Sequence, residues 1–338
     1  MDQPSSEPTQ PTEDGTKKQV VIEEIRFEHR RTPLGIGSAI PRISWTVQTK
    51  SENWHQSSYQ VRKLSIDGKV LVTSEKVQVD KSVLRPWPFD PLQSGEGCAI
   101  QVRVWDQDGG SCPWSEPAIV EAGLLTPEDW QAHFITPAIA EAKEEPQPLP
   151  LLRRAFVVKP GLKHARLYIT ALGVYEAEIN GQTVGDEVLA PGWTSYNHRL
   201  GYQTHDITKF LREGANAIGV FLGDGWYRGR IGFSGGEEAI WGKDLGLLAQ
   251  VEIVYADGSE EKIITDQNWL ASTGPILSAS LYDGETFDAR REQLGWSEPG
   301  FDDSSWSGVD LLQKNLSILF APEGPPVRRT QVLPPIET

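Results

Sequence analysis

The 338-residue sequence has few cysteines, a deficit of basic residues and no long apolar run. Its two cysteines, Cys98 and Cys112, flank a run that predicts a hairpin turning at residues 108–110. Folding about that turn places Cys112 opposite roughly residue 105, so a bridge to Cys98 is not expected. We predict free structural thiols; a reactive nucleophile is the minor alternative, because no histidine lies near either cysteine in the sequence.

The shortage of positive charge argues against two classes of partner. The chain has 32 Lys and Arg residues against 47 Asp and Glu, a net charge of −15, which repels phosphate backbones and anionic lipid head groups. No apolar run is long enough to cross a bilayer, and residues 1–19 lack the basic start and apolar core of a secretory signal. We therefore expect no nucleic acid partner, no membrane partner and a cytoplasmic location; secretion is expected only if the N-terminus is misassigned.

Short strands and turns dominate what the sequence does contain. Residues 1–19 have no aliphatic residue beyond the first methionine and predict a disordered tail. Residues 20–125 show alternating apolar runs separated by Gly, Pro, Asp and Ser, which predicts an all-β domain. In one run Ile100, Val102 and Val104 share a face. Residues 126–129, Thr-Pro-Glu-Asp, then predict a short helical turn at the domain boundary.

The strand pattern resumes after a proline-rich surface loop at 137–150, and residues 126–320 predict a second sandwich. Asn180-Gly181 is its strongest hairpin signal, because a type I′ turn needs two positive φ angles. Asp257-Gly258 predicts a second hairpin, and Asp206 with the residues after it predicts one capped helical turn. Residues 321–338, punctuated by proline, predict the start of a following module that is missing here.

Several segments carry a family resemblance. The strand AIQVRVW, its hairpin and PWSEPAIVEAG resemble the last hairpin of a fibronectin type III domain. A wider set resembles the N-terminal region of α-L-rhamnosidases: PRISWTVQT, VRVWDQDG, LRRAF, ALGVYEAEINGQTVGD, APGWTSYNHR, GDGWYRG and YDGETFDAR. The resemblance implies an all-β chain in which a fibronectin type III-like sandwich precedes a larger jelly-roll, galactose-binding-like sandwich. In that family an α/α barrel with the catalytic carboxylates comes later, and this chain stops before it.

No pair of acids in the sequence is predicted to catalyse glycoside hydrolysis, which needs two carboxyl groups roughly 5 to 10 Å apart. The nearest candidates, Asp283, Glu285 and Asp288, have the spacing of a turn and a strand edge, where Asp288 can pair with Arg290 or Arg291. We predict a non-catalytic N-terminal portion of an α-L-rhamnosidase-like hydrolase that recognises rhamnoside. The alternatives are full α-L-rhamnosidase activity and a purely structural scaffold for the missing catalytic barrel.

Sugar binding needs only an aromatic face and a few polar groups in a shallow site built from loops. Turn-rich segments of the second predicted domain contain both, and the candidate carbohydrate-binding residues are Asp186, Glu187, Trp193, Tyr196, Asn197, Arg199, Asp224, Trp226 and Tyr227. The alternative for the tryptophans is a packing role, since Trp in small sandwiches commonly lies in the core or beneath a loop.

A calcium site is suggested by the resemblance, because some rhamnosidases carry a jelly-roll module that holds rhamnose through a calcium ion. Calcium takes six to eight oxygen ligands. Asp186 and Glu187, after the Asn-Gly turn, are the best local pair, with the glycine-rich loop at 233–238 as a second contributor. The alternative is that these adjacent acids are simply solvated.

Overall fold

The computed structural model describes residues 20–31, 33–141, 147–334 and 336. Strands dominate, the only α-helix among these residues is one turn, and the all-β class is confirmed. No helix in the described ranges is long and apolar enough to cross a bilayer. The predicted disordered tail, 1–19, lies outside the described residues. The chain forms two compact units; the first comprises 20–31, 42–89 and 98–119, and the second takes the remaining described residues.

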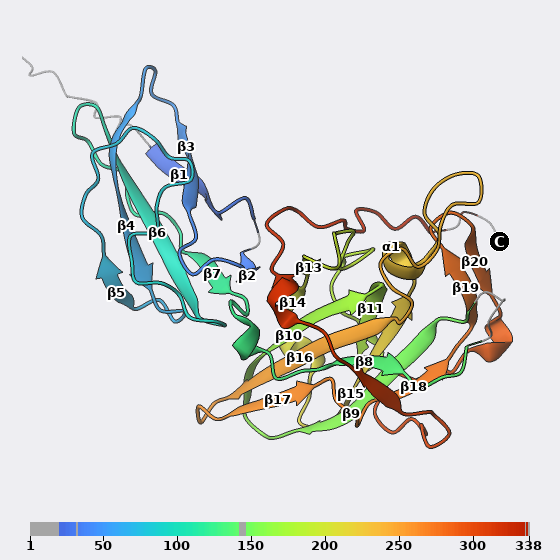
Figure 1. Cartoon of the computed structure of the whole chain (residues 1–338). Coiled ribbons are helices and arrows are strands. Elements are labelled where there is room, and N and C mark those ends of the chain that lie inside the picture. The colour runs from blue at the N-terminus through green and yellow to red at the C-terminus, as the bar shows by residue number, and fades with distance from the viewer. Residues whose placement is uncertain (1–19, 32, 142–146, 335, 337–338) are drawn as a thin grey trace, which may run out of the picture. The chain divides into compact units, whose positions relative to one another are not determined.

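The first unit contains two antiparallel groups of strands, seen in Figure 1. One is a two-stranded sheet of β1 (Val20–Phe27) and β3 (Ile43–Thr49). The other consists of three strands of a five-stranded sheet, in which β4 (Gln56–Leu64) lies between β5 (Val70–Thr73) and β6 (Gly97–Asp106). Ile100, Val102 and Val104 are all fully buried, which confirms their predicted shared face. Trp45 packs on Tyr59 in the same core, with ring centroids 4.8 Å apart.

Cationic and aromatic side chains alternate along one side of β6. The guanidinium of Arg103 lies 4.7 Å from the ring centroid of Trp105 and 4.6 Å from that of Trp114. Lys76 extends this stack over Trp105, and Arg62 extends it over Trp114, at 4.1 and 4.4 Å. Each such contact is worth roughly 0.5 to 1 kcal/mol at an exposed site. We call these five residues the cation–aromatic ladder.

Both cysteines are buried and unbridged, as predicted. The amide of Cys112 donates to the carbonyl of Val104 at 3.0 Å, so Cys112 lies opposite residue 104. Burial raises the pKa of the Cys112 thiol, which keeps it protonated and suits a structural role.

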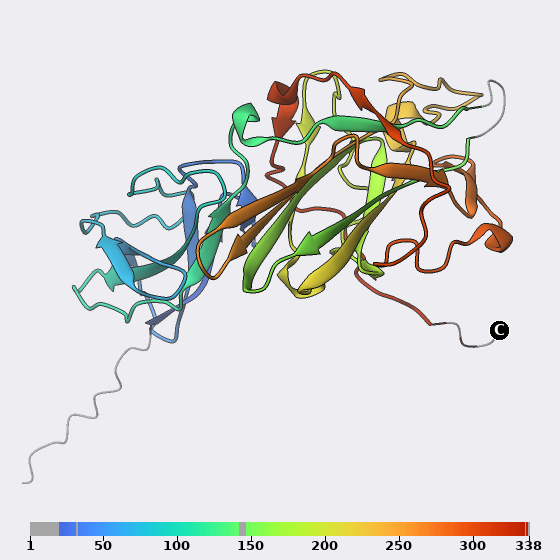
Figure 2. The same cartoon turned by 90° about the horizontal axis from the view of Figure 1, so that it is seen from below.

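The second unit is a larger β-sandwich of two mainly antiparallel sheets (Figures 1 and 2). The first has the order β14 (Gln203–Asp206), β10 (Leu162–Leu172), β16 (Gly246–Tyr255), β8 (Phe134–Pro137), β21 (Val309–Leu312), with β17 (Glu260–Ile264) also on β16. The second has the order β12 (Gln182–Thr183), β11 (Val174–Ile179), β15 (Gly214–Gly223), β9 (Pro150–Val158), β18 (Leu270–Thr273).

The core of this unit lies between the two sheets. Leu167 and Ile169 on β10 and Ile218 and Val220 on β15 are fully buried in one cluster. Alternate residues of each strand point inward, as the two-residue period requires, and each fully buried aliphatic side chain contributes roughly 1.5 to 3 kcal/mol. The other residues of each strand point outward, toward the segments that connect the strands.

The predicted turns have the expected geometry. Asn180 and Gly181 both have positive φ, 53° and 79°, between the paired residues Ile179 and Gln182. A 3₁₀ turn, η1 (Pro127–Asp129), follows the capping residue Thr126, and the second hairpin turns at Gly258 with φ 84°. The turn predicted after Asp206 is η2 (Thr208–Phe210), and the Asp206 carboxylate accepts the Thr208 amide at 3.0 Å.

Short elements fill the connections of the second unit. Two pairs are parallel: β2 (Leu34–Ile36) pairs with β7 (Ala118–Ala122), and β13 (Leu200–Gly201) pairs with β22 (Leu319–Phe320). β19 (Ile276–Ser280) and β20 (Gly284–Phe287) form a hairpin. The helical turns are α1 (Gly225–Arg228), η3 (Ala289–Arg291) and η4 (Leu316–Ile318). Beyond residue 320 the chain bonds back onto this unit, because the carbonyl of Val327 accepts from the amide of Val188 at 2.9 Å.

Candidate functional site

Five aromatic residues from three loops gather near α1, and we call Trp193, Tyr196, Trp226, Tyr227 and Trp241 the aromatic loop cluster. The indoles of Trp193 and Trp226 are stacked with centroids 6.0 Å apart and planes inclined by only 6°. Trp193 is 56% exposed, so one flat apolar face is open to solvent. The structure therefore brings together two candidates that lie 33 positions apart in the sequence.

The two tyrosines of the cluster have a different position, beneath the surface. Tyr196 and Tyr227 are each only 2% exposed, and their rings meet edge to face at 5.2 Å. The hydroxyl of Tyr196 donates to the carbonyl of Gly192 at 3.1 Å, and burial raises the pKa of both phenols. These contacts indicate that the two tyrosines support the Trp193 loop from beneath and do not face a ligand.

The turn that presents Trp226 requires glycine. Gly225 has φ 52°, and a Cβ atom there would lie 2.5 Å from Cγ1 of Val174. Asp224, just before it, forms an ion pair with Arg228 one turn later, with Oδ1 and Nε 2.7 Å apart. Arg228 also contacts Glu141 at 2.6 Å. Burial raises the pKa of Asp224, while the charge of Arg228 lowers it.

The candidates Asn197 and Arg199 lie in an exposed turn close in sequence to Trp193. The amide of Arg199 donates to the carbonyl of Ser195 at 2.9 Å, and the guanidinium lies 4.1 Å from the ring centroid of Phe320. Among the described residues, no side chain of the aromatic loop cluster bonds to Asn197, and its role stays a prediction.

Asp186 and Glu187 contact an arginine from near the end of the chain. Arg328 bonds to the carboxylate of Asp186, and its Nη2 lies 3.4 Å from Oε1 of Glu187. Within the described ranges no group of three or more His, Cys, Asp or Glu side chains is placed to hold a metal. This arrangement does not fit a calcium ion, which takes six to eight oxygens, because a guanidinium holds both carboxylates.

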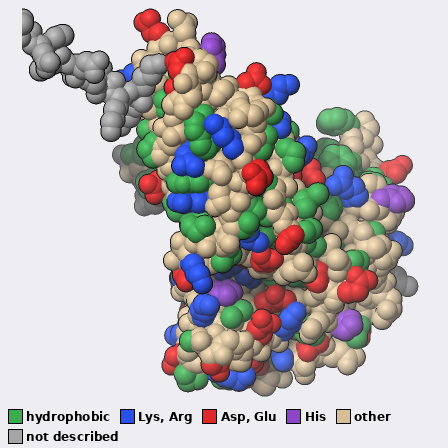
Figure 3. Space-filling view, turned by 90° about the vertical axis from the view of Figure 1, so that its left-hand side faces the viewer, with side chains coloured by type: hydrophobic (Ala, Val, Ile, Leu, Met, Phe, Trp, Pro, Cys, Tyr) green, Lys and Arg blue, Asp and Glu red, His purple; other side chains and the backbone are tan. Residues whose placement is uncertain are grey.

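Two of the three acids considered for catalysis, Asp283 and Asp288, form ion pairs. Asp288 pairs with Arg290 at 2.7 Å, as predicted, and its carboxylate accepts the amide of Arg290 at the start of η3. Asp283 makes two hydrogen bonds with Arg230, at 2.6 and 3.0 Å. These ion pairs lower the pKa of each aspartate. Acidic and basic side chains are also mixed on the face shown in Figure 3, which has no single-sign patch.

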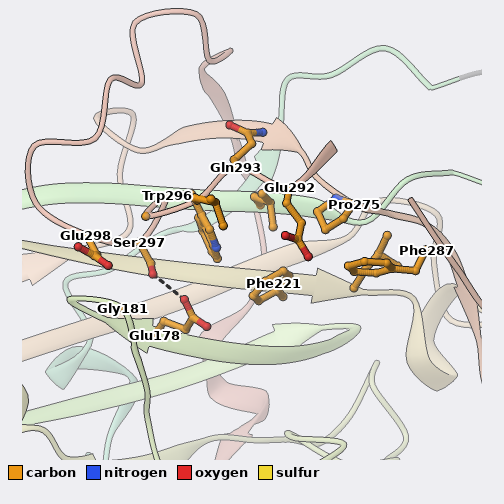
Figure 4. A pocket seen from close by; sticks show the side chains of 14 residues that line it. Glu178, Gly181, Phe221, Pro275, Phe287, Glu292, Gln293, Trp296, Ser297 and Glu298 are labelled. Atoms are coloured by element: carbon orange, nitrogen blue, oxygen red, sulfur yellow. Dashed lines mark hydrogen bonds between the residues drawn. The ribbon is translucent and has the colours of Figure 1, made fainter. Parts of the chain in front are cut away.

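A pocket of about 370 Å³ lies on the outer side of the sheet that contains β15, and Figure 4 shows its lining. The sheet supplies Leu151, Glu178 and Phe221, the β19–β20 hairpin supplies apolar residues, and residues 292–298 form the opposite wall. The Phe221 and Trp296 rings meet edge to face at 4.9 Å. The pocket thus combines aromatic walls with carboxylates.

The wall opposite the sheet is held by a buried cation. Arg153, 1% exposed in its side chain, donates from Nε to the carbonyl of Trp296 at 2.7 Å and from Nη2 to that of Glu298 at 2.8 Å. Its Nη1 pairs with the carboxylate of Asp303. Gln293 is fixed as well, because its amide donates to the carbonyl of Thr273 at 2.8 Å and accepts from Trp306 Nε1 at 3.1 Å.

The sequence alone does not point to this pocket. Glu178 alternates with the buried residues of β11 and precedes the Asn-Gly turn, which marks it only as an outward-facing residue. Trp296, in the segment Leu-Gly-Trp-Ser-Glu, has no local pattern that separates a pocket wall from ordinary packing. The pocket can be recognised only when the strands are paired and these distant residues come together.

Two family models match the chain. One is described as the alpha-L-rhamnosidase N-terminal domain and matches residues 161–331. The other, the Rha78A-like N-terminal immunoglobulin domain, matches residues 22–126. The predicted β-sandwich class is thus supported for the first unit, through an immunoglobulin-type model.

Individual relatives agree with these models. An alpha-L-rhamnosidase of Formosa agariphila is 34% identical over 313 residues, which cover 87% of this chain and 33% of the relative. The solved structure of native alfa-L-rhamnosidase from Aspergillus terreus is 44% identical, with a TM-score of 0.89 over 92% of this chain and 36% of that one. The chain therefore spans about a third of the length of these relatives.

A further solved structure, Streptomyces avermitilis alpha-L-rhamnosidase complexed with L-rhamnose, is 26% identical, with a TM-score of 0.85 over 92% of this chain and 47% of that one. The sequence match to the enzyme of that organism runs over 479 residues, more than this chain has, so that relative contains additional residues inside the matched region. Taken together, the matched models place this chain in the family of the alpha-L-rhamnosidase N-terminal domain.

Proposed function

We propose that this chain is the non-catalytic N-terminal portion of an α-L-rhamnosidase-like glycoside hydrolase, and that its second unit recognises rhamnose-containing carbohydrate. The family membership and the partial coverage of longer relatives support the first part. The pairing of Asp283 and Asp288 with arginines supports it as well, because these ion pairs lower the pKa of both carboxyls, whereas the general acid of a glycosidase needs a raised pKa.

The observation that carries carbohydrate recognition is the exposed Trp193–Trp226 stack. A sugar ring has an apolar face that packs on an indole and hydroxyls that need charged or polar partners. Trp193 offers the open face, and Trp226 holds it parallel from behind. Asp224 and Arg228 flank Trp226 in the sequence and pair with each other at 2.7 Å, and they are the polar groups that we propose for the sugar hydroxyls.

A titration of the 338-residue chain with L-rhamnose tests this proposal, with binding measured by calorimetry. Trp193→Ala is expected to weaken this binding about tenfold, since the aromatic platform contributes roughly 1 to 1.5 kcal/mol. Phe233→Ala is the matched control, because Phe233 is an 88% exposed aromatic on another loop. Unchanged affinity in Trp193→Ala contradicts the site, and hydrolysis of an aryl rhamnoside by this chain contradicts the non-catalytic assignment.

The calcium dependence that the resemblance implies is tested in the same titration. Because Arg328 holds Asp186 and Glu187, we expect a chelator to leave rhamnose affinity unchanged. A loss of affinity that added calcium restores would support the calcium site suggested by the resemblance.

A second candidate function, bracing a catalytic module, is favoured by two exposed apolar side chains of the second unit. Phe233 is 88% exposed and Leu294 is 85% exposed. Single exposed apolar side chains are common on protein surfaces, and they mark an interface where they form a contiguous patch. Absence of rhamnose binding, together with association of this chain with a separately produced catalytic module, would favour this function over sugar recognition.

A further inference from the structure

We propose that the pocket lined by Glu178, Phe221 and Trp296 is a second recognition site, separate from the aromatic loop cluster, for one neutral polyhydroxylated ring such as a sugar residue. Its volume of about 370 Å³ is at the lower end of the range of roughly 300 to 1,000 Å³ seen for ligand sites. A single ring suits this size better than an extended oligosaccharide.

Two polar groups in the pocket have capacity left for a ligand. Oε2 of Glu178 accepts a hydrogen bond from the hydroxyl of Ser297 at 2.5 Å, and no described residue bonds to its second oxygen. Nε1 of Trp296 donates to no described residue, although the side chain is only 9% exposed. This indole N–H is therefore available to an acceptor that enters the pocket.

A hydroxyl group matches this pair. It donates to a carboxylate and accepts from an indole N–H, whereas an ammonium group only donates. In Figure 4 the indole nitrogen lies on the edge of the ring toward Ser297 and Glu178. Neighbouring hydroxyls of one sugar ring are therefore suited to use both groups at once.

The apolar walls suit the other surface of a sugar. Figure 4 shows Phe221, Trp296 and Phe287 around the same space, and Phe287 is 51% exposed at the mouth. Aromatic rings pack on the C–H face of a sugar without needing its hydroxyls. The two kinds of wall therefore match the two kinds of surface on a single ring.

The charges of the lining exclude an anion. Glu178, Glu292 and Glu298 are the charged residues that line the pocket, and no Lys or Arg lines it. A phosphate or carboxylate ligand would be repelled. An organic cation would be attracted by these carboxylates, but it offers no acceptor to the Trp296 N–H. The test therefore includes the organic cation choline.

The wall of the pocket at residues 292–298 is held in place by hydrogen bonds within the chain. Arg153 fixes the backbone at residues 296 and 298, and Gln293 is bonded at both ends of its amide. Preorganised walls lower the entropy cost of binding, which allows a small pocket to retain a small ligand.

The test is a ¹H–¹⁵N NMR titration of the whole chain that follows its tryptophan indole signals, with the Trp296 signal assigned by its loss in Trp296→Phe. We expect L-rhamnose to shift the Trp296 signal. Glu178→Gln is expected to weaken this response about tenfold, because it removes a charge-assisted hydrogen bond. Glu176→Gln is the matched control, since Glu176 is an exposed glutamate of the same strand that does not line the pocket.

Three further arms separate the alternatives. In Trp193→Ala the Trp296 response is expected to persist, which separates this pocket from the aromatic loop cluster. D-glucose in place of L-rhamnose is expected to shift the same signal with different affinity. The inference is overturned if neither sugar shifts the Trp296 signal, or if choline shifts it in a salt-sensitive manner while the sugars do not, because that identifies a cation site.

Discussion

Trp296 lies directly on the backbone of Gly219 in β15, so closely that a Cβ atom on the glycine would be 2.6 Å from Cζ3 of the indole and 2.8 Å from Cβ of Ser297. The strand face that forms one side of the pocket therefore has a gap in its row of side chains, and the opposite wall fills it. Trp296 can take this position only because residue 219, a glycine, has no side chain.

Gly219→Ala is the first prediction that follows. The added methyl group cannot be accommodated without displacing Trp296 and Ser297, and overpacking of this kind costs roughly 1 to 3 kcal/mol in the free energy of unfolding. Urea unfolding measures that loss, and the Trp296 indole signal should shift as well. Gly308→Ala is the matched control, because a Cβ there meets no atom within 4 Å. Equal stability of the two variants would contradict the packing argument.

Arg153 gives a second prediction about the same wall. Its side chain is 1% exposed and serves two carbonyls and the Asp303 carboxylate. Arg153→Met leaves these acceptors unpaired and is expected to lower the free energy of unfolding by about 3 kcal/mol. Arg153→Lys keeps the charge but not the planar fork, so it should restore only part of this stability. Urea unfolding of the two variants decides, and a fully stable lysine variant would show that charge alone suffices.

The local features of this fold were predictable from the sequence because each depends on neighbouring residues. Asn180 and Gly181 form the expected hairpin since few other residues adopt positive φ, and Asn180 adds hydrogen bonds from its side chain to Phe210 and Asn216, both at 2.8 Å. Thr126 starts a helical turn for the same kind of reason. The buried, unbridged cysteines followed from hairpin register.

The sites were harder to predict because they join distant segments. Glu178 and Ser297 meet only after β11 has entered the sheet and the segment after η3 has folded across it. Asp186 and Glu187 look like a free acidic pair in the sequence, but Arg328, more than a hundred residues later, occupies them. A local pattern shows which chemistry is available, and tertiary packing decides which groups face each other.

The cation–aromatic ladder of the first unit yields a third prediction. Arg103 lies between Trp105 and Trp114 and donates to the side chain of Gln60 at 2.8 Å. Arg103→Gln removes both ring contacts and is expected to lower the free energy of unfolding by about 1 to 2 kcal/mol. Lys69→Gln, in the turn between β4 and β5, serves as the comparison, since Lys69 is an exposed cation of the same unit that is not part of the cation–aromatic ladder. Thermal unfolding followed by near-UV circular dichroism, which reports the tryptophans, measures the effect.

His205 supplies the last prediction, a dependence of stability on pH. Its imidazole packs against Gly185, where a Cβ atom would lie 3.1 Å from Nδ1. Burial first, and then the charge of Arg328, lower its pKa from 6.5 to about 4, while Asp186 opposes the shift. Because the folded pKa is below the unfolded one, the unfolded chain takes up a proton first as the pH falls. The contribution of His205 is therefore complete above about pH 6.5 and is lost toward about pH 4.

At pH 5 this loss is expected to be about 1 to 2 kcal/mol of the free energy of unfolding relative to pH 7. His205→Gln removes the titrating group, so its stability should fall less between these two pH values than that of the unaltered chain. His198→Gln, at an exposed loop position, is the matched control. Urea unfolding at both pH values gives the comparison, and an identical pH dependence in all three proteins would mean that His205 is protonated in the folded state as readily as in the unfolded chain.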